Sequence, residues 1–451
     1  MSADRRPDVS VVVTHYDAAD RLALVLAGLA AQTLTAARFE VVVVDDGSPA
    51  PPVLPDQPYA LRLVRQDDRG FRAAAARNLG ASATTGPLLC FLDGDTVPEP
   101  GYLEAVLAGC DAIAVEDALD GRGPGEALVV GRRRHADLAG WTPGRLRAWF
   151  HGGPEAPEEL TEPTWLLDGF RWTDDLRAAD DESYRFVIAA VLSLHRSLFD
   201  RVGGFEGSFR AYGGEDWELA NRCWLAGASL RYEPTAVAWH DGVDFAGREV
   251  DRRAVQNGQA ATLASLLPSP ATRPPGPVWT YPLVVVEVDD RGFTAEQALL
   301  VVAPLLRAGD VGVWLREGSV AADGAPLAHD PRVHVGPVPI DALRRCRARV
   351  RLDAPVELDE PLLDVVARAP VDAPGLRVRH ARDLARHGWG PHVPDRSAPS
   401  GSSVRPVPDD VSLGGLLRAR SEAGAPGTTH PGRRHPAPPG LLPGGRTAPR
   451  P

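Results

Sequence analysis

The chain has 451 residues, of which 44% are hydrophobic and 24% charged, a composition typical of a globular protein with roughly two to four domains. Its formal net charge is −11, which argues against nucleic acid as the main partner, because binding a phosphate backbone requires a basic surface. The four cysteines are widely spaced and form no C-x-x-C pair, which argues against a disulfide framework or a thiolate zinc site and favours a reducing compartment.

The first hundred or so residues alternate between apolar runs and segments with helical periodicity. Strands are predicted at 9–16, 39–45, 61–66, 87–93 and 111–116, and helices at 20–32, 72–83 and 98–109. Nearly continuous apolar strands separated by helices predict a parallel sheet covered on both faces. Ligands of such sheets bind beyond the carboxyl ends of the strands.

Polar residues stand at the carboxyl ends of three of these predicted strands. They are Thr14, His15 and Tyr16, then Asp45 and Asp46, then Asp93 and Asp95. Because these ends meet at one edge of the sheet, the sequence predicts a ligand site there.

The rest of the chain predicts a longer first domain and a smaller second one. Segments 132–141 and 142–153 have helical character, and a helix from about 216 to 226 precedes a strand that ends at His240. A proline-rich break follows, then further strands and helices, then a Pro, Gly, Ser and Arg-rich stretch. The predicted boundaries are 1–267 for the catalytic domain, 268–277 for a linker, 278–393 for a small α/β domain and 394–451 for a disordered tail.

The sequence contains neither a signal-peptide pattern at its N-terminus nor an apolar run of the roughly 18 to 20 residues that a membrane span needs. We therefore expect a soluble, cytoplasmic protein, with association at a membrane surface left open. The oligomeric state is not predicted.

Asp93 and Asp95 flank Gly94 directly after an apolar run, so two like charges lie close together. Carboxylates without thiolates select a hard divalent cation such as Mg²⁺ or Mn²⁺. The alternative is a simple turn, since Asp-Gly is a common turn pair. These residues alone leave both interpretations open, because D-x-D is a short and abundant pattern.

The other candidates also have structural alternatives. Asp46 suits a nucleobase or ribose ligand, or a cap and turn. Glu215 and Asp216 follow two glycines, where carboxylates either cap a helix or point into a cleft. His240 is either a packed residue or a metal ligand. Arg77 either binds a diphosphate or lies on a solvated helix face.

Together these segments resemble the family 2 glycosyltransferases with the GT-A fold. The resemblance rests on "VSVVVTHYD", "VVVVDDGS", "ARNLGA", "FLDGDTVPEPGYL" and "VGGFEGSFRAYGGEDWELANRCWLAG" with a downstream histidine, in this order over about residues 8–245. The later segment resembles the carboxyl half of galactosyltransferase-type enzymes. The implied fold is a Rossmann-like mixed sheet flanked by helices, and nothing is implied for residues 276–451.

The resemblance also implies a role for each matching residue. Asp216 is the expected catalytic base and Glu215 positions the acceptor or the donor sugar. Asp95 and His240 are the expected ligands of Mn²⁺ or Mg²⁺. The expected nucleotide and donor residues are Thr14, Tyr16, Asp46, Arg77 and Asp93.

The implied reaction is transfer of a sugar, with inversion, from a UDP-hexose or UDP-N-acetylhexosamine to a hydroxyl of a glycan or small molecule. The metal would neutralise the leaving diphosphate, and a base would remove the acceptor proton. One rival is a sugar-phosphate nucleotidyltransferase, but the chain lacks the expected glycine-rich loop and contains no lysine. The other rival is a non-catalytic nucleotide-sugar-binding relative. The donor sugar, the acceptor and the roles of 117–185 and 278–393 stay open.

Overall fold

The computed structural model describes residues 6–120, 126–210, 213–244, 252–319, 326–389 and 404–407. The chain divides into two compact units, Met1–Thr262 and Leu263–Pro451. Each unit is built around its own β-sheet.

The first unit contains a nine-stranded mixed sheet with the order β3-β2-β1-β4-β8-β6-β9-β5 and β7 beside β6. Its strands are β1 (Val9–His15), β2 (Phe39–Asp45), β3 (Ala60–Arg65), β4 (Leu88–Asp93), β5 (Thr96–Pro98), β6 (Ala127–Asp137), β7 (Glu158–Leu160), β8 (Val191–His195) and β9 (Ser229–Asp241). Its helices are α1 (Ala19–Ala30), α2 (Ala73–Ser82), α3 (Tyr102–Leu119), α4 (Pro143–Phe150), α5 (Thr164–Trp172), α6 (Arg196–Val202) and α7 (Glu215–Leu225). Helix α8 (Arg252–Leu266) crosses the boundary between the units.

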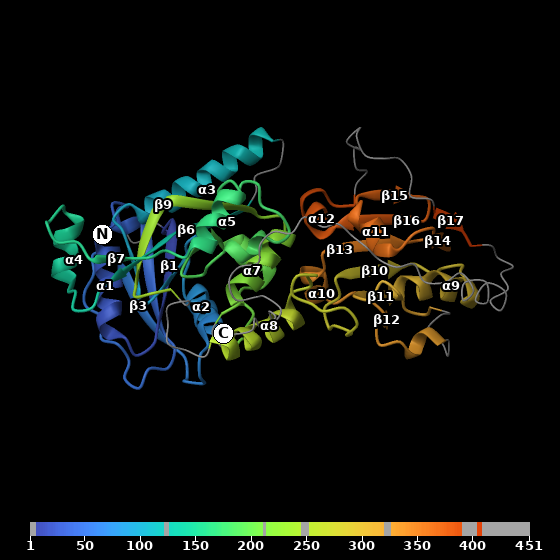
Figure 1. Ribbon diagram of the computed structural model, residues 1–451, viewed down its shortest axis with the longest axis horizontal. Helices are drawn as coiled ribbons and strands as arrows, with labels where there is room; N and C mark the ends of the chain where they lie inside the picture. The colour runs from blue at the N-terminus through green and yellow to red at the C-terminus, as the bar shows by residue number, and fades with distance from the viewer. Residues whose placement is uncertain are drawn as a thin grey trace, which may run out of the picture. The chain divides into compact units, whose positions relative to one another are not determined.

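The parallel half of the sheet agrees with the sequence prediction. Strands β3, β2, β1 and β4 are parallel neighbours, and the valines of β1 and β2 are fully buried. Figure 1 shows α1 and α2 on opposite sides of these strands, as right-handed crossovers require. Beyond β4 the strand β8 runs antiparallel, which makes the whole sheet mixed.

Two predicted elements are wrong. The predicted strand 111–116 is the continuation of α3, which runs on through Gly109; the segment itself contains no glycine or proline, and its alanines and glutamate favour a helix. The helical prediction for 132–141 is also wrong over 132–137, which belong to β6: residues 132–136 pair with β9 and Asp137 pairs with β7. The arginines of this strand hide the usual apolar alternation, and they are paired with acidic side chains such as Glu162 and Asp244.

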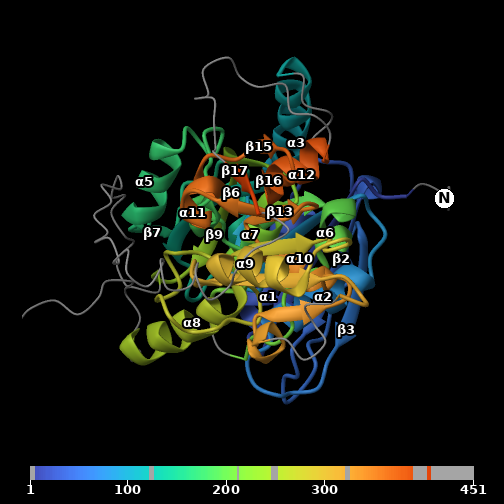
Figure 2. The same cartoon turned by 90° about the vertical axis from the view of Figure 1, so that its right-hand side faces the viewer.

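The second unit contains a six-stranded sheet with the order β12-β11-β10-β13-β16-β15. Its strands are β10 (Val284–Val288), β11 (Val311–Leu315), β12 (Val333–Val335), β13 (Ala348–Leu352), β15 (Val371–Ala373) and β16 (Leu376–His380). Its helices, labelled in Figure 2, are α9 (Ala295–Leu306), α10 (Ile340–Arg345), α11 (Leu362–Ala367) and α12 (Ala381–His387). Helices α9 and α11 pack against this sheet and form the larger hydrophobic core of the unit with it. Helix α10 packs against Val285 and Trp314 in a smaller cluster.

Two observations bear on the predicted linker and tail. Within 268–277, Ser269 and Arg273 are buried, and the Arg273 guanidinium donates to the carboxylate of Asp310 at 2.9 Å. In the region predicted to be disordered, β17 (Val404–Pro406) pairs with β14 (Val356–Leu358), which departs from that prediction. Apart from these residues and Val407, the chain from 394 onward lies outside the described residues. Across the described parts of the chain, no helix is long and apolar enough to cross a membrane.

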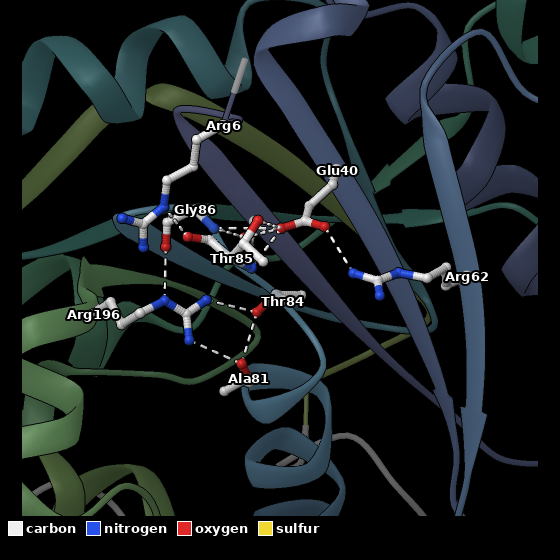
Figure 3. Close-up of polar contacts among 9 residues, drawn as sticks. Arg6, Glu40, Arg62, Ala81, Thr84, Thr85, Gly86 and Arg196 are labelled. Atoms are coloured by element: carbon white, nitrogen blue, oxygen red, sulfur yellow. Dashed lines mark hydrogen bonds and ion pairs between the residues drawn. The ribbon is translucent and has the colours of Figure 1, made fainter. Parts of the chain in front are cut away.

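A polar cluster joins the strands at the amino end of the parallel sheet (Figure 3). The buried carboxylate of Glu40 accepts hydrogen bonds from the Ser10 hydroxyl at 2.8 Å, the Thr85 amide at 2.6 Å and the Arg62 guanidinium at 2.9 Å. Arg196 donates to the carbonyls of Gly86 and Ala81 and so ties β8 to the same loop. Burial by itself raises the pKa of Glu40, but these hydrogen bonds outweigh it and bring that pKa below its ordinary value.

We expect Glu40→Gln to lower the free energy of unfolding of the first unit by roughly 2 to 4 kcal/mol, because it removes a buried charge that several donors share. Because folding lowers the pKa of Glu40, its ionised carboxylate stabilises the fold fully at any pH above the pKa that Glu40 has in the unfolded chain. This stabilisation is lost as the pH falls through the pKa of Glu40 in the folded protein. Urea denaturation at pH 7 and pH 4 measures both effects. Exposed Glu155→Gln is the control, and equal losses in the two variants would contradict the prediction.

Candidate active site

The carboxyl ends of β1 and β4 meet at Thr14 and Asp93, which are partners in the strand register. The Thr14 hydroxyl donates to the Asp93 carboxylate at 3.4 Å. Gly94 then passes directly over β1, where a Cβ atom would lie 2.4 Å from the Thr14 carbonyl oxygen. A side chain at this position would therefore displace the turn that carries Asp93 and Asp95.

Arg77 joins two distant parts of the chain. Its guanidinium donates to Asp93 at 2.8 Å and to Glu215 at 2.8 Å, although Glu215 lies 138 residues later. Both Arg77 and Glu215 are buried, and the guanidinium lies 5.3 Å from the centre of the Phe205 ring. Burial by itself lowers the pKa of Arg77, but the two carboxylates outweigh it and raise the pKa, so the side chain stays charged.

Glu215 and Asp216 begin helix α7 after two glycines with φ near +90°. This left-handed backbone is strained for other residues, and it brings both carboxylates to the helix start. The Asp216 carboxylate accepts from the Trp217 amide at 2.9 Å and from the Ala189 amide at 3.4 Å. Burial, and next the charge of Glu215, raise the pKa of Asp216 to about 7 against the opposing effect of Arg77.

Asp95 directly precedes β5, and His240 lies on β9 opposite Thr96, the first residue of β5. The Asp95 Oδ1 and His240 Nδ1 atoms are 3.2 Å apart, and His240 is almost fully buried. Two ligands of one octahedral ion have a similar spacing, because bonds of about 2.1 Å at right angles place the ligand atoms about 3 Å apart. Within the described residues no group of three or more His, Cys, Asp or Glu forms a site that could hold a metal by itself. These two donors therefore fit a cation that also takes oxygens from a ligand and water.

The aspartates after β2 have different environments. Asp45 is fully buried and accepts from the amide and hydroxyl of Ser48, so it stabilises the turn that follows β2. The Asp46 carboxylate accepts from the Arg72 amide at 3.0 Å and from the side-chain amide of Gln66. A carboxylate has about four acceptor positions, so Asp46 retains capacity for a ligand N–H.

Tyr16 lies at the same end of β1 and is half exposed. The nearby charge of Asp68 raises the pKa of the Tyr16 hydroxyl. Gly47 allows the loop to pass close by, since a Cβ atom there would be 2.3 Å from the Asp68 amide nitrogen. The ring of Tyr16 is thus an accessible aromatic surface beside Asp46.

Most of the predicted site residues therefore share one sheet edge, connected by hydrogen bonds or by short stretches of chain. Thr14, Asp93, Arg77, Glu215 and Asp216 form one group, which Gly94 joins to Asp95 and His240. Sequence reasoning missed Gln66 and Phe205. Gln66 directly follows β3, so the strand-end rule would have found it, whereas nothing in the sequence links Phe205 to Arg77.

Two models of known protein families match the part of the chain that contains this sheet edge. Residues 10–156 match the family model described as glycosyl transferase family 2, and residues 180–238 match the one described as N-terminal domain of galactosyltransferase. The first unit carries a family 2 glycosyltransferase domain. Its mixed sheet has the GT-A fold, and the candidate residues lie within or next to the matched ranges.

Several relatives of this glycosyltransferase domain are known. A chondroitin synthase of Escherichia coli is 27% identical over 58% of this chain and 38% of its own length. A validoxylamine A glucosyltransferase of Streptomyces hygroscopicus subsp. jinggangensis is 34% identical over 48% of this chain and 51% of its own. A solved structure of S. aureus TarS 1-349 in complex with UDP-GlcNAc has a TM-score of 0.37, with 15% identity over 57% of this chain and 67% of that chain. The chain thus spans about half or less of the length of these two curated relatives.

Proposed function

We propose that the chain is a metal-dependent, inverting glycosyltransferase that moves a sugar from a UDP-hexose or UDP-N-acetylhexosamine to an acceptor hydroxyl. The observation that carries the proposal is the environment of Asp216. It lies at a helix start with a pKa of about 7, beside the Arg77 bridge to the Asp93 edge. A carboxylate of that pKa is a far better proton acceptor than an ordinary aspartate and is still largely ionised near pH 7.5.

In this proposal Asp216 removes the proton from the acceptor hydroxyl as its oxygen attacks the anomeric carbon of the donor. The pair Arg77 and Glu215 holds the start of α7 against β4, which keeps the base at a fixed distance from the donor. One base without an enzyme nucleophile gives inversion in a single displacement. Glu215 has one carboxylate oxygen without a hydrogen-bond partner, which suits a sugar hydroxyl.

The donor would lie along the carboxyl ends of β1, β2 and β4. Asp46 would accept from a nucleobase N–H while Tyr16 and the Thr14 backbone border the base, and Asp93 would meet the ribose or donor sugar. Asp95 and His240 would hold Mn²⁺ or Mg²⁺, which when bound neutralises negative charge on the diphosphate leaving group.

The two relatives act in different settings, as their names state: one makes chondroitin and the other glucosylates validoxylamine A. Polymer and small-molecule acceptors are therefore both compatible with this domain. We place the enzyme in the synthesis of a polysaccharide or of a glycosylated small molecule, in the cytoplasm. We infer a UDP donor, whose base N–H would meet Asp46 and whose ribose or sugar would meet Asp93.

The test is UDP release from a panel of UDP-sugars, with Mn²⁺ or with a chelator, together with UDP binding by calorimetry. We expect metal-dependent release from one donor, and we expect Asp95→Asn to weaken Mn²⁺-dependent UDP binding about tenfold or more, because it removes one of two protein ligands. Glu104→Gln, an exposed acid on α3, should behave as the native protein. Absence of UDP binding, or release that the chelator leaves unchanged, would refute the proposal.

A further inference from the structure

The second unit places four arginines on one face of its sheet. Arg349 and Arg351 of β13 stand opposite Arg379 and Arg377 of β16 in the antiparallel register. The valines between them point into the main core and are fully buried. Like charges directly opposite one another destabilise strand pairing unless opposite charges offset them.

The carboxylates on this face offset only part of that charge. Both oxygens of Asp372 accept from Arg379 at 2.8 Å, and Arg349 donates to Glu287 at 2.6 Å. Arg351 reaches that same Glu287 at 3.6 Å. Arg377 is 3.4 Å from Asp353, so the pairs found among the described residues share three carboxylates between these four guanidiniums, and the two outer arginines, Arg351 and Arg377, have the longest of these contacts.

These two outer arginines line a cavity of about 700 Å³. It lies at the carboxyl ends of β10, β11 and β13. The next strand in the chain, β11, pairs with one side of β10, and β13 pairs with its other side. In α/β sheets such a switch in strand order is where ligands bind, and the volume suits a small organic molecule.

The lining of this cavity has one more arginine than it has carboxylates although the whole chain is acidic, and one of its arginines, Arg316, also lies 3.4 Å from the buried Asp290. Arg291 and Arg316 join Arg351 and Arg377, and these four arginines face three acidic side chains, Glu287, Asp289 and Asp353. Asp289 is already paired with Arg291. The Arg351 guanidinium lies 4.2 Å from the centre of the Trp389 ring, a contact that restricts its orientation.

We propose that this cavity binds a small phosphorylated ligand of the size of a sugar phosphate or mononucleotide, with Arg351 and Arg377 donating to its phosphoryl oxygens. The planar guanidinium matches phosphate with two parallel hydrogen bonds, and two adjacent guanidiniums match its double charge. Binding would also offset the repulsion between the two strands. The site belongs to the second unit and does not depend on the proposed transfer reaction.

The test is calorimetric titration of the full chain at constant ionic strength and without divalent cations. The probes are glucose 6-phosphate, UMP and inorganic phosphate, with glucuronate and glucose as carboxylate and neutral comparisons. We expect glucose 6-phosphate or UMP to bind with a Kd of about 1 mM or tighter, and glucuronate and glucose to bind at least tenfold more weakly, since they lack the phosphoryl group. The stronger of the two phosphorylated probes identifies the source as a sugar phosphate or a nucleotide.

Variants then locate the binding. The double variant Arg351→Gln with Arg377→Gln should lose about tenfold or more in affinity, the factor for a lost charge-assisted hydrogen bond. Arg368→Gln, which removes an arginine paired with Glu360 and outside the cavity lining, should bind as the native chain. The unfolding temperature of the double variant should be unchanged or higher, which excludes misfolding as the cause.

Four results would overturn the proposal. The first is that no phosphorylated probe binds, and the second is that the double variant binds like the native chain. The third is that Asp93→Asn in the first unit abolishes binding, which would assign the ligand to the transferase edge. Equal affinity for glucuronate would likewise contradict the phosphate assignment.

Discussion

Replacing Asp216 by asparagine is expected to lower the rate of sugar transfer by about 10²- to 10⁴-fold, which is what a positioned general base contributes. Asparagine retains the shape of the side chain but cannot accept the proton. Binding of the UDP-sugar should be little affected, because none of the proposed nucleotide and donor residues Thr14, Tyr16, Asp46, Arg77 and Asp93 lies on α7. Initial rates of UDP release and calorimetric UDP binding measure the two effects separately.

The pH dependence gives this prediction a second measurement. Because the base acts when ionised, kcat/KM of the native enzyme should fall as the pH drops through about 7, the pKa of Asp216. The neutral asparagine also relieves the unfavourable burial of a charge beside Glu215, so the unfolding temperature should not fall. Asp111→Asn, an exposed change on α3, is the control. A variant at position 216 that keeps native rates would refute the role of the base.

The second large effect is expected at Arg77. Arg77→Met leaves Asp93 and Glu215 without the cation that both contact, and should lower the free energy of unfolding of the first unit by about 3 to 5 kcal/mol. Arg77→Lys should cost less, because it keeps the charge, but one ammonium group cannot reproduce the planar two-sided contact. Urea denaturation measures both variants.

The surface variant Arg177→Met, which removes a pair with Asp174, is the matched control and should cost about 1 kcal/mol or less. Arg77 also lowers the pKa of Asp216, so in Arg77→Lys, where the charge moves, the acid limb of the rate profile should shift to higher pH. Native stability of Arg77→Met would show that the bridge does not hold α7 to the sheet edge.

The parts of the fold that were predicted correctly follow from patterns within single segments, whereas the parts that were missed depend on elements distant in the sequence. The apolar runs that became β1, β2 and β4 are local patterns, and the rule that parallel strand ends share one edge placed Thr14, Asp46, Asp93 and Asp95 together. The same rule extends to Gln66, which was overlooked. The predictions failed at 111–116 and 132–137, where a local pattern fits both helix and strand and only the neighbouring element decides.

The sequence by itself determined the strand ends, the glycines at 94, 213 and 214, and the order of segments that resembles one enzyme family. Only the tertiary structure decided that Arg77 bridges Asp93 and Glu215, since no local pattern relates residues 138 positions apart. The raised pKa of Asp216 likewise follows only from the tertiary structure, because the burial of this side chain depends on what packs around it. The tertiary structure also set Arg351 opposite Arg377, because strand register is a property of the assembled sheet rather than of either strand.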